Sequence, residues 1–455
     1  MKERKLAVII LAAGKGTRMK SKTSKVLHKL AGRPLIGHLF ETLGSLSPHQ
    51  IITVISSEQS DVAEIASDTT LALQNPPLGT GHAAAAALPL LKDASCQDVL
   101  VVFGDTPFLT VETIKRMLEA LKGPRDPAVV VLGFRPSDSM EYGRLVTDSK
   151  GQLEKIVEAK DASVGILEID LCNAGIMAFD GARFADLLSA IDNDNATSEY
   201  YLTDVVSIAR SRGWNCISIE TDDPNEVMGI NSRVDLACAE AILQEKLRKA
   251  AMENGVTLTD PETVWFSADT LIGQDVTVGP NVWFGPGVIV EKNVEIRSFC
   301  HIEGAKIEEG AIIGPFARLR PGSQIGKSAH IGNFVEIKEA VLEDKVKVNH
   351  LSYIGDSFVG SGVNIGAGTI TCNYDGFSKY KTEIGEGAFI GSNTSLVAPI
   401  KIGKGAITGA GSTLSQNIPE NSLAVTRAKE TIKSGWANEF RRLKEIGNNQ
   451  DKNKE

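Results

Sequence analysis

The feature that most constrains this chain is a short phrase that recurs from about residue 271 to residue 410. Each unit starts with an aliphatic residue, continues with a small or polar residue and has a small or β-branched residue four places on. Early examples are Ile272-Gly273, Val278-Gly279 and Phe284-Gly285, and late ones are Ile390-Gly391 and Ile402-Gly403. One such unit cannot bury its own apolar side chain, so successive coils must stack to form a core. The repeat therefore predicts a parallel β-helix of six-residue units.

The alternative for this region is a sandwich of ordinary short strands. Sandwich strands would alternate apolar and polar residues with a period of two, and the intervals between them would be longer and irregular. The near-constant spacing of the aliphatic positions favours the β-helix.

Length and composition limit the classes of protein to which the chain can belong. Its 455 residues suffice for two or three domains, and 42% hydrophobic with 23% charged residues is typical of a globular protein. No stretch approaches the roughly 18 apolar residues of a membrane helix, and the N-terminus resembles a first strand more than a secretory signal. Six cysteines without a Cys-x-x-Cys pair suggest neither a zinc knuckle nor a disulfide framework. We therefore expect a cytoplasmic protein without membrane insertion.

The net charge of −9 argues against a protein that coats nucleic acid. It leaves small anionic substrates open, because local Lys, Arg and backbone N–H groups can hold them.

The first half of the chain alternates apolar runs with helical patterns. The apolar runs are 5–11, 51–55, 99–103, 128–133 and 172–179, and the clearest helical patterns are 35–43 and 111–121. This order predicts a Rossmann-like, doubly wound α/β domain with a mostly parallel sheet. In such a domain the ligand site lies at the carboxyl ends of the strands.

Two features follow predicted strands at that edge. The turn 12–19 carries Gly14-Lys15-Gly16 and Arg18, which suits close approach to a phosphate, but it matches neither the Walker A loop nor the dinucleotide fingerprint. By spacing alone it is either a phosphate loop or an ordinary turn. Asp105 ends the run 99–103 and is either a Mg²⁺ ligand or the N-cap of a helix, since Thr106-Pro107 follow.

Several motifs in order resemble the sugar-nucleotide pyrophosphorylase family over the first ~230 residues. They are residues 11–19, Lys25-Val26-Leu27, residues 78–82, Gly104-Asp105, Tyr142-Gly143-Arg144, Ile156-Val157-Glu158, Asn173-Ala174-Gly175 and residues 199–204. The resemblance implies that a sugar 1-phosphate attacks the α-phosphate of a nucleoside triphosphate and releases pyrophosphate. Such a transfer depends on positioning and charge neutralisation more than on a protein nucleophile.

The resemblance also implies roles for single residues. Those at the nucleotide and the UDP-sugar are Leu11, Ala12, Ala13, Gly14, Lys15, Arg18, Lys25, Gln74, Gly79, Thr80, Asp105, Gly143, Glu158, Asn173 and Asn231. Lys15 and Arg18 would neutralise the leaving pyrophosphate, and Lys25 would reach the reacting phosphates. Asp105 and Asn231 resemble the Mg²⁺ ligands. Ser24 departs from the family pattern, in which proline often precedes the lysine.

Between the halves, Asn231-Ser232 can cap a helix from about Val234 to Met252, and Asn254-Gly255 can end it. We expect the domains 1–229 and 253–437, joined by a linker helix at 230–252. Residues 438–455 are polar, with no periodic apolar stripe, and are expected to fray.

The repeat is interrupted twice, at 343–353 and at 371–381, and chemistry is expected where the regular pattern fails. The second interruption should project as a loop with aromatic and cationic residues, which suits a lid over an anionic cofactor. His350, in the first, is either a general base or a hydrogen-bonded corner histidine. A zinc site of the γ-carbonic anhydrase kind would need two histidines five residues apart, and the chain has no such pair.

The segments 313–322, 332–336 and 364–376 complete a second resemblance, which spans about 430 residues. The family joins an N-acetylglucosamine-1-phosphate uridylyltransferase to a glucosamine-1-phosphate N-acetyltransferase and makes UDP-N-acetylglucosamine, a precursor of cell wall and lipopolysaccharide. Its second half resembles left-handed β-helix acyltransferases, which form trimers with active sites between subunits. The resemblance thus implies a homotrimer that uses Mg²⁺, with UTP and acetyl-CoA as co-substrates.

In that resemblance His350 deprotonates the amine of glucosamine 1-phosphate, and Glu336 is a candidate to orient it. The acceptor sugar would contact Arg320, Lys338, Tyr353 and Asn364. Acetyl-CoA would contact Ala367, Asn373, Tyr374, Ser392, Ala410 and Arg427. Two alternatives remain: a single-activity nucleotidylyltransferase whose β-helix serves oligomerisation or regulation, and a regulatory relative without activity. The latter is expected to lack Lys25 or Asp105, and both are present.

Overall fold

The computed structural model describes residues 4–91, 96–139, 141–149 and 151–452, and for residues 447–452 the backbone alone. It divides into two compact units, Met1–Leu247 and Arg248–Glu455, each of which is described by itself. The division falls inside helix α8 (Arg233–Glu253), close to where the sequence suggested a linker helix. The domain limits drawn from the sequence stay a prediction.

The first unit is built around one mixed sheet with the strand order β11-β7-β10-β6-β1-β4-β5, to which β8 and β9 add a side hairpin. Strand β10 runs antiparallel to both β6 and β7, whereas β6, β1, β4 and β5 are parallel to one another. The strands are β1 (Leu6–Leu11), β4 (Gln50–Ile55), β5 (Thr70–Leu73), β6 (Asp98–Phe103), β7 (Pro127–Phe134), β8 (Arg144–Thr147), β9 (Leu153–Val157), β10 (Cys172–Asp180) and β11 (Asn215–Glu220); β2 (Lys29–Leu30) and β3 (Arg33–Pro34) form a small separate ribbon.

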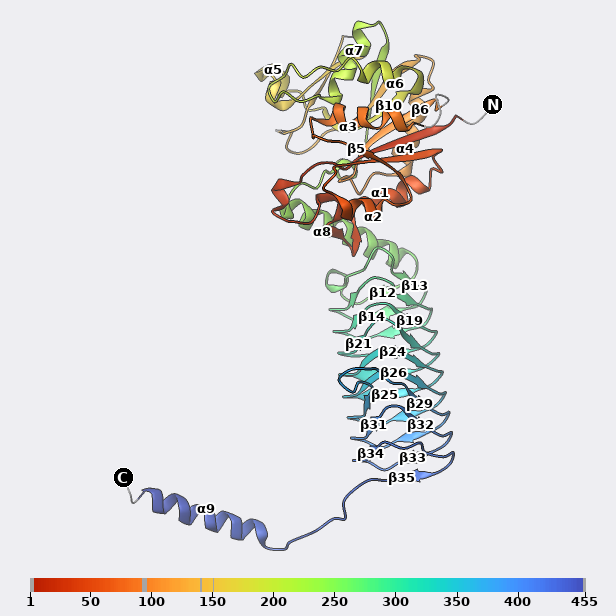
Figure 1. Ribbon diagram of the computed structural model, residues 1–455, viewed down its shortest axis with the longest axis vertical. Helices are drawn as coiled ribbons and strands as arrows, with labels where there is room; N and C mark the ends of the chain where they lie inside the picture. Colours follow the sequence, from red (N-terminus) through yellow and green to blue (C-terminus); the bar gives the residue numbers. More distant parts are fainter. Residues whose placement is uncertain (1–3, 92–95, 140, 150, 453–455) are drawn as a thin grey trace. The chain divides into compact units, whose positions relative to one another are not determined.

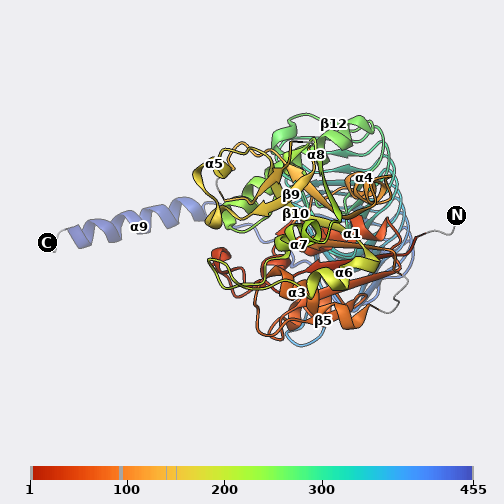
Figure 2. The same ribbon diagram turned by 90° about the horizontal axis from the view of Figure 1, so that it is seen from above.

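Helices cover both faces of this sheet (Figure 1 and Figure 2). Strand β1 has no exposed side because Ala7, Ile9 and Leu11 belong to one apolar core and Leu6, Val8 and Ile10 to the other. Helices α1, α2 and α4 contribute to the second core, and α3, α6 and α7 contribute to the first. The helices are α1 (Leu35–Gly44), α2 (Ser60–Ile65), α3 (Thr80–Ala86), α4 (Val111–Leu121), α5 (Val164–Leu167), α6 (Gly181–Leu188) and α7 (Val205–Ser211).

The second unit contains stacked coils whose short strands pair in parallel throughout their ladders (Figure 1). This parallel pairing of short strands in stacked coils excludes the alternative of a β-sandwich. One sheet contains β12 (Thr257–Leu258), β14 (Thr277–Val278), β17 (Glu295–Ile296), β20 (Ile312–Ile313), β23 (His330–Asn333), β25 (Lys347–His350), β27 (Asn364–Ile365), β30 (Phe389–Ile390), β33 (Ile407–Thr408) and β35 (Leu423–Ala424).

The other coil strands form one larger sheet, in which the seven-residue strands β24 and β26 join two ladders. It contains β13 (Leu271–Ile272), β15 (Trp283–Phe284), β16 (Ile289–Val290), β18 (His301–Ile302), β19 (Ala305–Ile307), β21 (Arg318–Leu319), β22 (Ser323–Ile325), β24 (Glu336–Leu342), β26 (Tyr353–Val359), β28 (Ile370–Cys372), β29 (Thr382–Ile384), β31 (Ser395–Val397), β32 (Ile400–Ile402) and β34 (Thr413–Leu414).

The aliphatic residue that leads each repeat unit points inward and stacks on its equivalents in the coils above and below. One such stack, all buried, is Val278, Ile296, Ile313, Ile331, Val348, Ile365 and Ile390. This stacking supplies the core that no single unit could form, as the repeat predicted.

Of the two predicted interruptions, the first is wrong. Residues 343–353 continue the ladder, because β25 pairs with β23 and with β27 in ordinary register. The second is an inserted loop: Asn364 pairs with Phe389 across a longer interval of chain than separates Phe389 from its own partner Ile407. Charged residues at 343–347 lie on an exposed turn of a regular coil, which explains why the sequence looked interrupted there.

The tail also differs from expectation. Helix α9 (Trp436–Lys452) forms where a frayed segment was predicted. Trp436, Phe440, Leu443 and Ile446 follow a helical spacing and make an exposed apolar stripe that begins just before residue 438. Residues 453–455 of the predicted tail lie outside the described residues. In the part of the chain that the structure describes, no helix combines the length and apolar character needed to cross a membrane.

Candidate functional site

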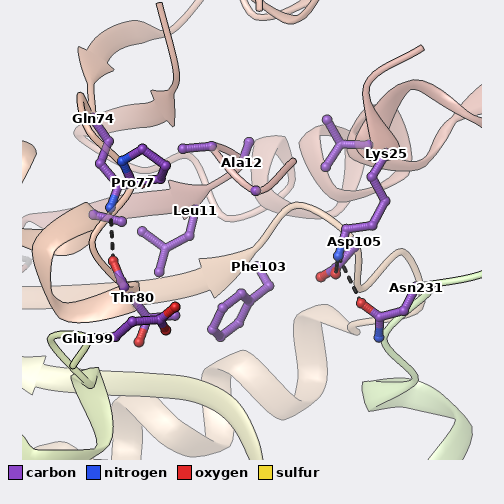
Figure 3. Close-up of a pocket in the computed structure, with 15 residues that line it drawn as sticks. Leu11, Ala12, Lys25, Gln74, Pro77, Thr80, Phe103, Asp105, Glu199 and Asn231 are labelled. Carbon is purple, nitrogen blue, oxygen red and sulfur yellow. Dashed lines mark hydrogen bonds and ion pairs between the residues drawn. The ribbon is translucent and has the colours of Figure 1, made fainter. Parts of the chain in front are cut away.

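A cavity of about 350 Å³ opens at the carboxyl ends of β1 and β6 in the first unit (Figure 3). Its lining includes the predicted residues Leu11, Ala12, Ala13, Gly14, Lys25, Gln74, Gly79, Thr80, Asp105 and Asn231. Figure 3 shows Lys25, Asp105 and Asn231 gathered at one end and Gln74, Thr80 and Glu199 at the other. The structure therefore brings together ten residues that are scattered over 221 positions of the sequence, from Leu11 to Asn231.

At the end of the cavity that contains Lys25, two side-chain oxygens accept hydrogen bonds from its ammonium group. The Lys25 Nζ atom donates to Oδ2 of Asp105 and, over 3.0 Å, to Oδ1 of Asn231. The Lys25 and Asp105 side chains are only 15% and 13% exposed, so the pair is shielded from water and its attraction is strong.

Local backbone features fix these three side chains. Gly16 has a positive φ of 56°, and a Cβ there would lie 2.6 Å from Cβ of Lys25, so only glycine lets the turn after β1 close against Lys25. Ser232 and Asp235 form a reciprocal cap at the start of α8: Ser232 N–H donates to Asp235 Oδ2 over 2.8 Å, and Asp235 N–H donates to Ser232 Oγ over 3.2 Å. The same Asp235 oxygen accepts from the Asn231 N–H, which holds Asn231 at the cavity.

The other end of the cavity is shaped by Gln74 and the turn before α3. Gln74 is buried and donates to the Gly79 carbonyl over 2.9 Å. Gly79 has a φ of 108°, and a Cβ there would lie 2.6 Å from the Tyr200 carbonyl, so no other residue fits. Thr80 Oγ1 accepts from the Leu202 N–H over 3.0 Å. This hydrogen bond joins the segment 199–203 to the wall of the cavity that Gln74 and Gly79 form.

A second cavity of about 290 Å³ shares Thr80, Phe103 and Asp105 with the first. The predicted sugar residues Gly143, Glu158 and Asn173 line it, together with Thr203, which was not among the predicted residues. The Asn173 N–H donates to the Gly143 carbonyl over 2.8 Å, so β10 and the turn before β8 hold these two residues side by side. Thr203 donates to Oε1 of Glu158 over 3.0 Å.

Glu158 and Thr203 also line a third, acidic cavity with Asp161, Asp192 and Asp204. Burial raises the pKa of Glu158, and the nearby Asp161 raises it further, although the Thr203 hydrogen bond opposes this. Burial, followed by the charges of Asp192, Glu158 and Asp161, raises the pKa of Asp204 to about 6. The acidic cavity next to Glu158 therefore contains a carboxyl group, that of Asp204, whose pKa of about 6 lies in a mildly acidic range.

Lys15 and Arg18 lie on the turn after β1, but neither lines these cavities. Both are exposed, and Arg18 forms a 3.4 Å ion pair with Glu141. Glu199, by contrast, lines the first cavity and was part of a predicted motif without a predicted role. Its position in the motif 199–204 was the only signal for it.

In the second unit, His350 ends strand β25 and is exposed. Its Nδ1 atom lies 2.8 Å from Oδ1 of Asn333, its partner in the preceding coil. Glu336, the candidate to orient His350, is engaged elsewhere: its Oε1 accepts from Arg320 over 2.8 Å, and Arg318 lies 3.8 Å from its Oε2. The side chain in contact with the imidazole is that of Asn333, whose amide oxygen accepts the hydrogen bond, and the orienting role of Glu336 stays a prediction.

The predicted acceptor-sugar residues lie around the corner between β25 and β26. Arg320 follows β21, Lys338 is in β24, and Tyr353 begins β26 three residues after His350. The Lys338 Nζ atom lies 3.9 Å from Oδ2 of Asp356, and Tyr353 pairs with Glu336 across the ladder. Asn364 begins β27, the strand next to the one that carries His350.

The register aligns four predicted residues in one column of the coil. Counting two residues on from the paired Val348 and Ile365 places His350 beside Ala367, and the following ladders place Ser392 and Ala410 in the same line. Backbone hydrogen bonds agree, since Gly368 donates to His350, Asn393 to Ala367 and Gly411 to Ser392. Arg427 joins this column at its end: a Cβ on Gly411 would lie 3.7 Å from its Cδ.

The inserted loop contains the remaining two predicted residues. Asn373 is buried at its base, where its amide donates to Asp356 and, over 3.4 Å, to the Tyr353 hydroxyl. Tyr374 is exposed. Asp375 accepts from the N–H groups of Phe377 and Ser378, and these bonds lower the pKa of its carboxyl and stabilise the turn.

Comparison with known proteins covers both units. A MobA-like NTP transferase domain matches residues 8–159, and bacterial transferase hexapeptide repeats match residues 304–339 and 381–416. The bifunctional protein GlmU of Paramagnetospirillum magneticum is 54% identical over 97% of this chain and 98% of its own length. That of Rhodospirillum rubrum is 55% identical over 96% of this chain and 97% of its own. The chain belongs to the GlmU family.

Membership in the GlmU family confirms the family and the fold class predicted from the sequence. It also confirms an enzyme with nucleotidyltransferase and N-acetyltransferase activities, which uses UTP, acetyl-CoA and Mg²⁺. The single-activity alternative loses support, because relatives that match both units end to end are bifunctional proteins. The role of each residue remains a proposal.

Proposed function

We propose that each unit carries one of the two reactions of the family. At the coil corner around His350, an acetyl group passes from acetyl-CoA to the amine of glucosamine 1-phosphate. In the cavity around Lys25, the resulting N-acetylglucosamine 1-phosphate receives the uridylyl group of UTP. One observation carries the proposal: each residue set assigned to one reaction is scattered in the sequence but gathered in one region of the fold.

For uridylyl transfer, a phosphate oxygen of the sugar attacks the α-phosphorus of UTP, and the bond to the pyrophosphate oxygen breaks. Lys25 is held at the cavity by Asp105 and Asn231, where its ammonium neutralises the reacting phosphates. Lys15 and Arg18 are exposed on the neighbouring turn and would meet the leaving pyrophosphate there. No protein nucleophile is required, since the two substrates supply both reacting groups.

The donors at this end of the cavity fit Mg²⁺. One carboxylate oxygen of Asp105 and one amide oxygen of Asn231 are hard oxygen ligands, and both face the Lys25 ammonium, which would move toward the substrate phosphates when Mg²⁺ binds these oxygens. Among the described residues no cluster of three or more His, Cys, Asp and Glu could hold a metal, so phosphate oxygens and water would complete the coordination. When bound, the ion supplies charge stabilisation at the transferring phosphoryl group.

At the opposite end of the cavity, Gln74 and the backbone of Gly79-Thr80 are the groups placed to hold the base. In the adjoining cavity, Glu158 and Asn173 offer acceptors to sugar hydroxyls, and Gly143 leaves room for the ring, since a Cβ there would lie 3.3 Å from Glu158 Oε2. The contacts Thr80, Phe103 and Asp105, shared by both cavities, mark where the two substrates would meet.

For acetyl transfer, the amine nitrogen attacks the thioester carbonyl, the carbon–sulfur bond breaks, and the thiolate of CoA leaves. Because Oδ1 of Asn333 accepts from Nδ1 of His350, Nδ1 carries the proton and Nε2 is the basic nitrogen that takes the proton from the amine. Arg320 and Lys338 supply positive charge for the sugar phosphate, and Tyr353 and Asn364 lie close by for its hydroxyls. No covalent enzyme intermediate is needed.

The column Ala367, Ser392 and Ala410 suits a long donor such as acetyl-CoA. These residues are small and follow His350 in successive coils, so no large side chain of the column covers the outer surface of the coil along this line. Asn373 and Tyr374 belong to the inserted loop beside this column. Arg427 provides a cation at the end of the column for a cofactor phosphate.

We also propose a homotrimer in the cytoplasm. Phe299, Phe316 and Phe334 stack at one coil corner with centroids 4.8 and 5.2 Å apart, and together with Leu351 they stay about half exposed in a single chain. Such a ridge favours association with further copies. The location is supported by the buried free thiols Cys172, Cys216 and Cys300.

The proposal is tested by two separate assays on the purified chain. Glucosamine 1-phosphate and acetyl-CoA alone should release free thiol, and N-acetylglucosamine 1-phosphate with UTP and Mg²⁺ should release pyrophosphate. Thiol release without any pyrophosphate, or the reverse, would contradict the assignment of one reaction to each unit. Sedimentation or light scattering on the same preparation gives the oligomeric state, for which three copies are expected.

A further inference from the structure

Asp356 lies between residues assigned to two different substrates. Its Oδ2 atom is 3.9 Å from Nζ of Lys338, in the acceptor-sugar set, and it accepts a hydrogen bond from the amide of Asn373, in the acetyl-CoA set. The same Asn373 amide lies 3.4 Å from the Tyr353 hydroxyl, again in the acceptor set. The Lys338 and Asp356 side chains are only 16% and 17% exposed, so these contacts are sheltered from water.

The backbone at Asp356 is unusual for a residue with a side chain. It has a φ of 48°, in the left-handed region that glycine adopts without cost. The register places Asp356 at a coil corner occupied in earlier coils by Gly287, Gly304 and Gly322, all with positive φ, and then by Glu339, with a φ of 45°. Other coil residues with side chains, such as Phe316 and Leu351, also have a positive φ, so Asp356 differs from the earlier corners in the contacts of its carboxylate and not in its backbone.

The next coil shows what this side chain can reach. After Asp356 the chain makes one more turn and leaves the coil in the inserted loop, at whose base Asn373 is buried. The loop returns to this point, because the Tyr380 N–H donates to the Asn373 carbonyl over 2.8 Å. The carboxylate of Asp356, on the same strand β26 as Tyr353, therefore connects the base of the loop to Lys338 on the neighbouring strand β24.

We propose that Asp356 is a positioning residue that couples the acceptor-sugar site to the acetyl-CoA site. It orients Asn373 toward the donor and keeps the Lys338 ammonium at the acceptor phosphate, so that the amine and the thioester meet in one geometry. The inference rests on the proposed acetyl transfer and concerns a residue that touches neither substrate in it.

The test compares Asp356→Gly, which removes the side chain and relaxes the backbone, with Asp356→Asn, which keeps its size and tolerates the left-handed region. Glu339→Gln is the matched control, since Glu339 occupies the same corner one coil earlier, has a positive φ and is exposed. Thiol release gives KM for each substrate, pyrophosphate release reports whether the variants stay folded, and calorimetry gives the affinities for CoA and for glucosamine 1-phosphate.

For Asp356→Gly we expect both affinities to fall about ten-fold, since the hydrogen bond from Asn373 and the ion pair with Lys338 are both lost. Asp356→Asn should hold CoA nearly as well as the native chain, because its Oδ1 still accepts from Asn373, and should bind the sugar phosphate more weakly. Pyrophosphate release should be unchanged in both, and Glu339→Gln should match the native chain in every assay.

Normal thiol release with unchanged affinities in Asp356→Gly would overturn the positioning role, and so would an effect on one substrate alone. If Asp356→Gly fails to fold, unchanged affinity of Asp356→Asn for glucosamine 1-phosphate would overturn it equally. A native chain that binds both ligands without releasing thiol would instead overturn the proposed acetyl transfer, while the affinities of the variants still decide on the coupling.

Discussion

The two units place their functional residues in opposite kinds of surroundings. In the first unit, Lys25, Asp105 and Asn231 meet in a cavity at the ends of buried strands, and each comes from a different element. In the second, His350 and the column that follows it lie on the outer surface of a regular coil, one residue per coil. The enclosed site forms where loops from different parts of the chain converge. The site on the coil forms because the strand register aligns residues from successive coils.

This difference predicts how each site should respond to damage. A cavity depends on mutual contacts, so loss of one member leaves a buried charge without its partner. The column after His350 depends only on the regular spacing of the coils, so the side chain of one member can be removed without disturbing the others. The predictions below test this contrast, from the largest expected effect to the smallest.

Replacement of His350 by alanine should lower acetyl transfer by about 10²- to 10⁴-fold, the usual contribution of a general base. Uridylyl transfer should be unchanged, because His350 belongs to the other unit. The measurement is thiol and pyrophosphate release from one preparation, with His330→Ala, one coil earlier in the same sheet, as the control. Full thiol release by His350→Ala would show that another group takes the proton.

Replacement of Asp105 by alanine should lower uridylyl transfer by about 10²- to 10³-fold. The substitution removes both the negative charge that holds Lys25 and one oxygen ligand of the metal. Acetyl transfer should persist. Titration of Mg²⁺ in the pyrophosphate assay should show weaker saturation in the variant. Asp222, which is fully exposed, provides the control through Asp222→Ala. An equal loss in both assays would mean that the substitution unfolds the chain.

Replacement of Asn333 by alanine should reduce acetyl transfer about ten-fold, since the hydrogen bond that fixes the His350 ring is removed while the imidazole remains. Asn333→Asp keeps an acceptor oxygen at the same place and should recover most of the rate. The pair of variants is compared by kcat for thiol release. Equal rates for Asn333→Ala and the native chain would return the orienting role to another residue.

The smallest effect concerns pH. Burial raises the pKa of Glu158, so the carboxylate that accepts from sugar hydroxyls is lost as the pH falls through that raised value. KM for N-acetylglucosamine 1-phosphate should therefore rise as the pH falls through the raised pKa of Glu158, while KM for UTP should change less.

Asp161→Asn should shift this KM profile to lower pH, because the charge of Asp161 is one cause of the raised pKa of Glu158. Its Oδ1 accepts from the Ala196 N–H over 3.2 Å, and an asparagine oxygen can do the same, so the fold should be retained. An unshifted profile would mean that Glu158 does not set the pH dependence.

Much of both regions could be predicted from the sequence. The strand ends and helix limits of the first unit follow apolar runs, and the coil follows the aliphatic repeat, because both patterns record burial directly. Side-chain pairing could not be predicted in this way. Glu336 is nearer to His350 in sequence than Asn333 is, and only the register shows that Asn333 lies beside His350 while Arg320 binds Glu336.

Other errors have similar physical causes. The charged turn at 343–347 looked like an interruption because exposed turn residues carry no information on spacing. The apolar stripe of α9 was missed because its first member, Trp436, lies before the polar tail as it was drawn. The roles of Lys15 and Arg18 stay predictions, because both side chains are exposed on the turn after β1 and do not line the two cavities.

The central claim is that the two reactions use separate sets of residues, one in each unit of the chain. The most direct test mixes His350→Ala with Asp105→Ala and supplies glucosamine 1-phosphate, acetyl-CoA, UTP and Mg²⁺. Neither variant alone should make UDP-N-acetylglucosamine at an appreciable rate, whereas the mixture should make it steadily, since each variant keeps one intact reaction. A mixture that stays inactive, although each variant performs its remaining reaction, would contradict the claim.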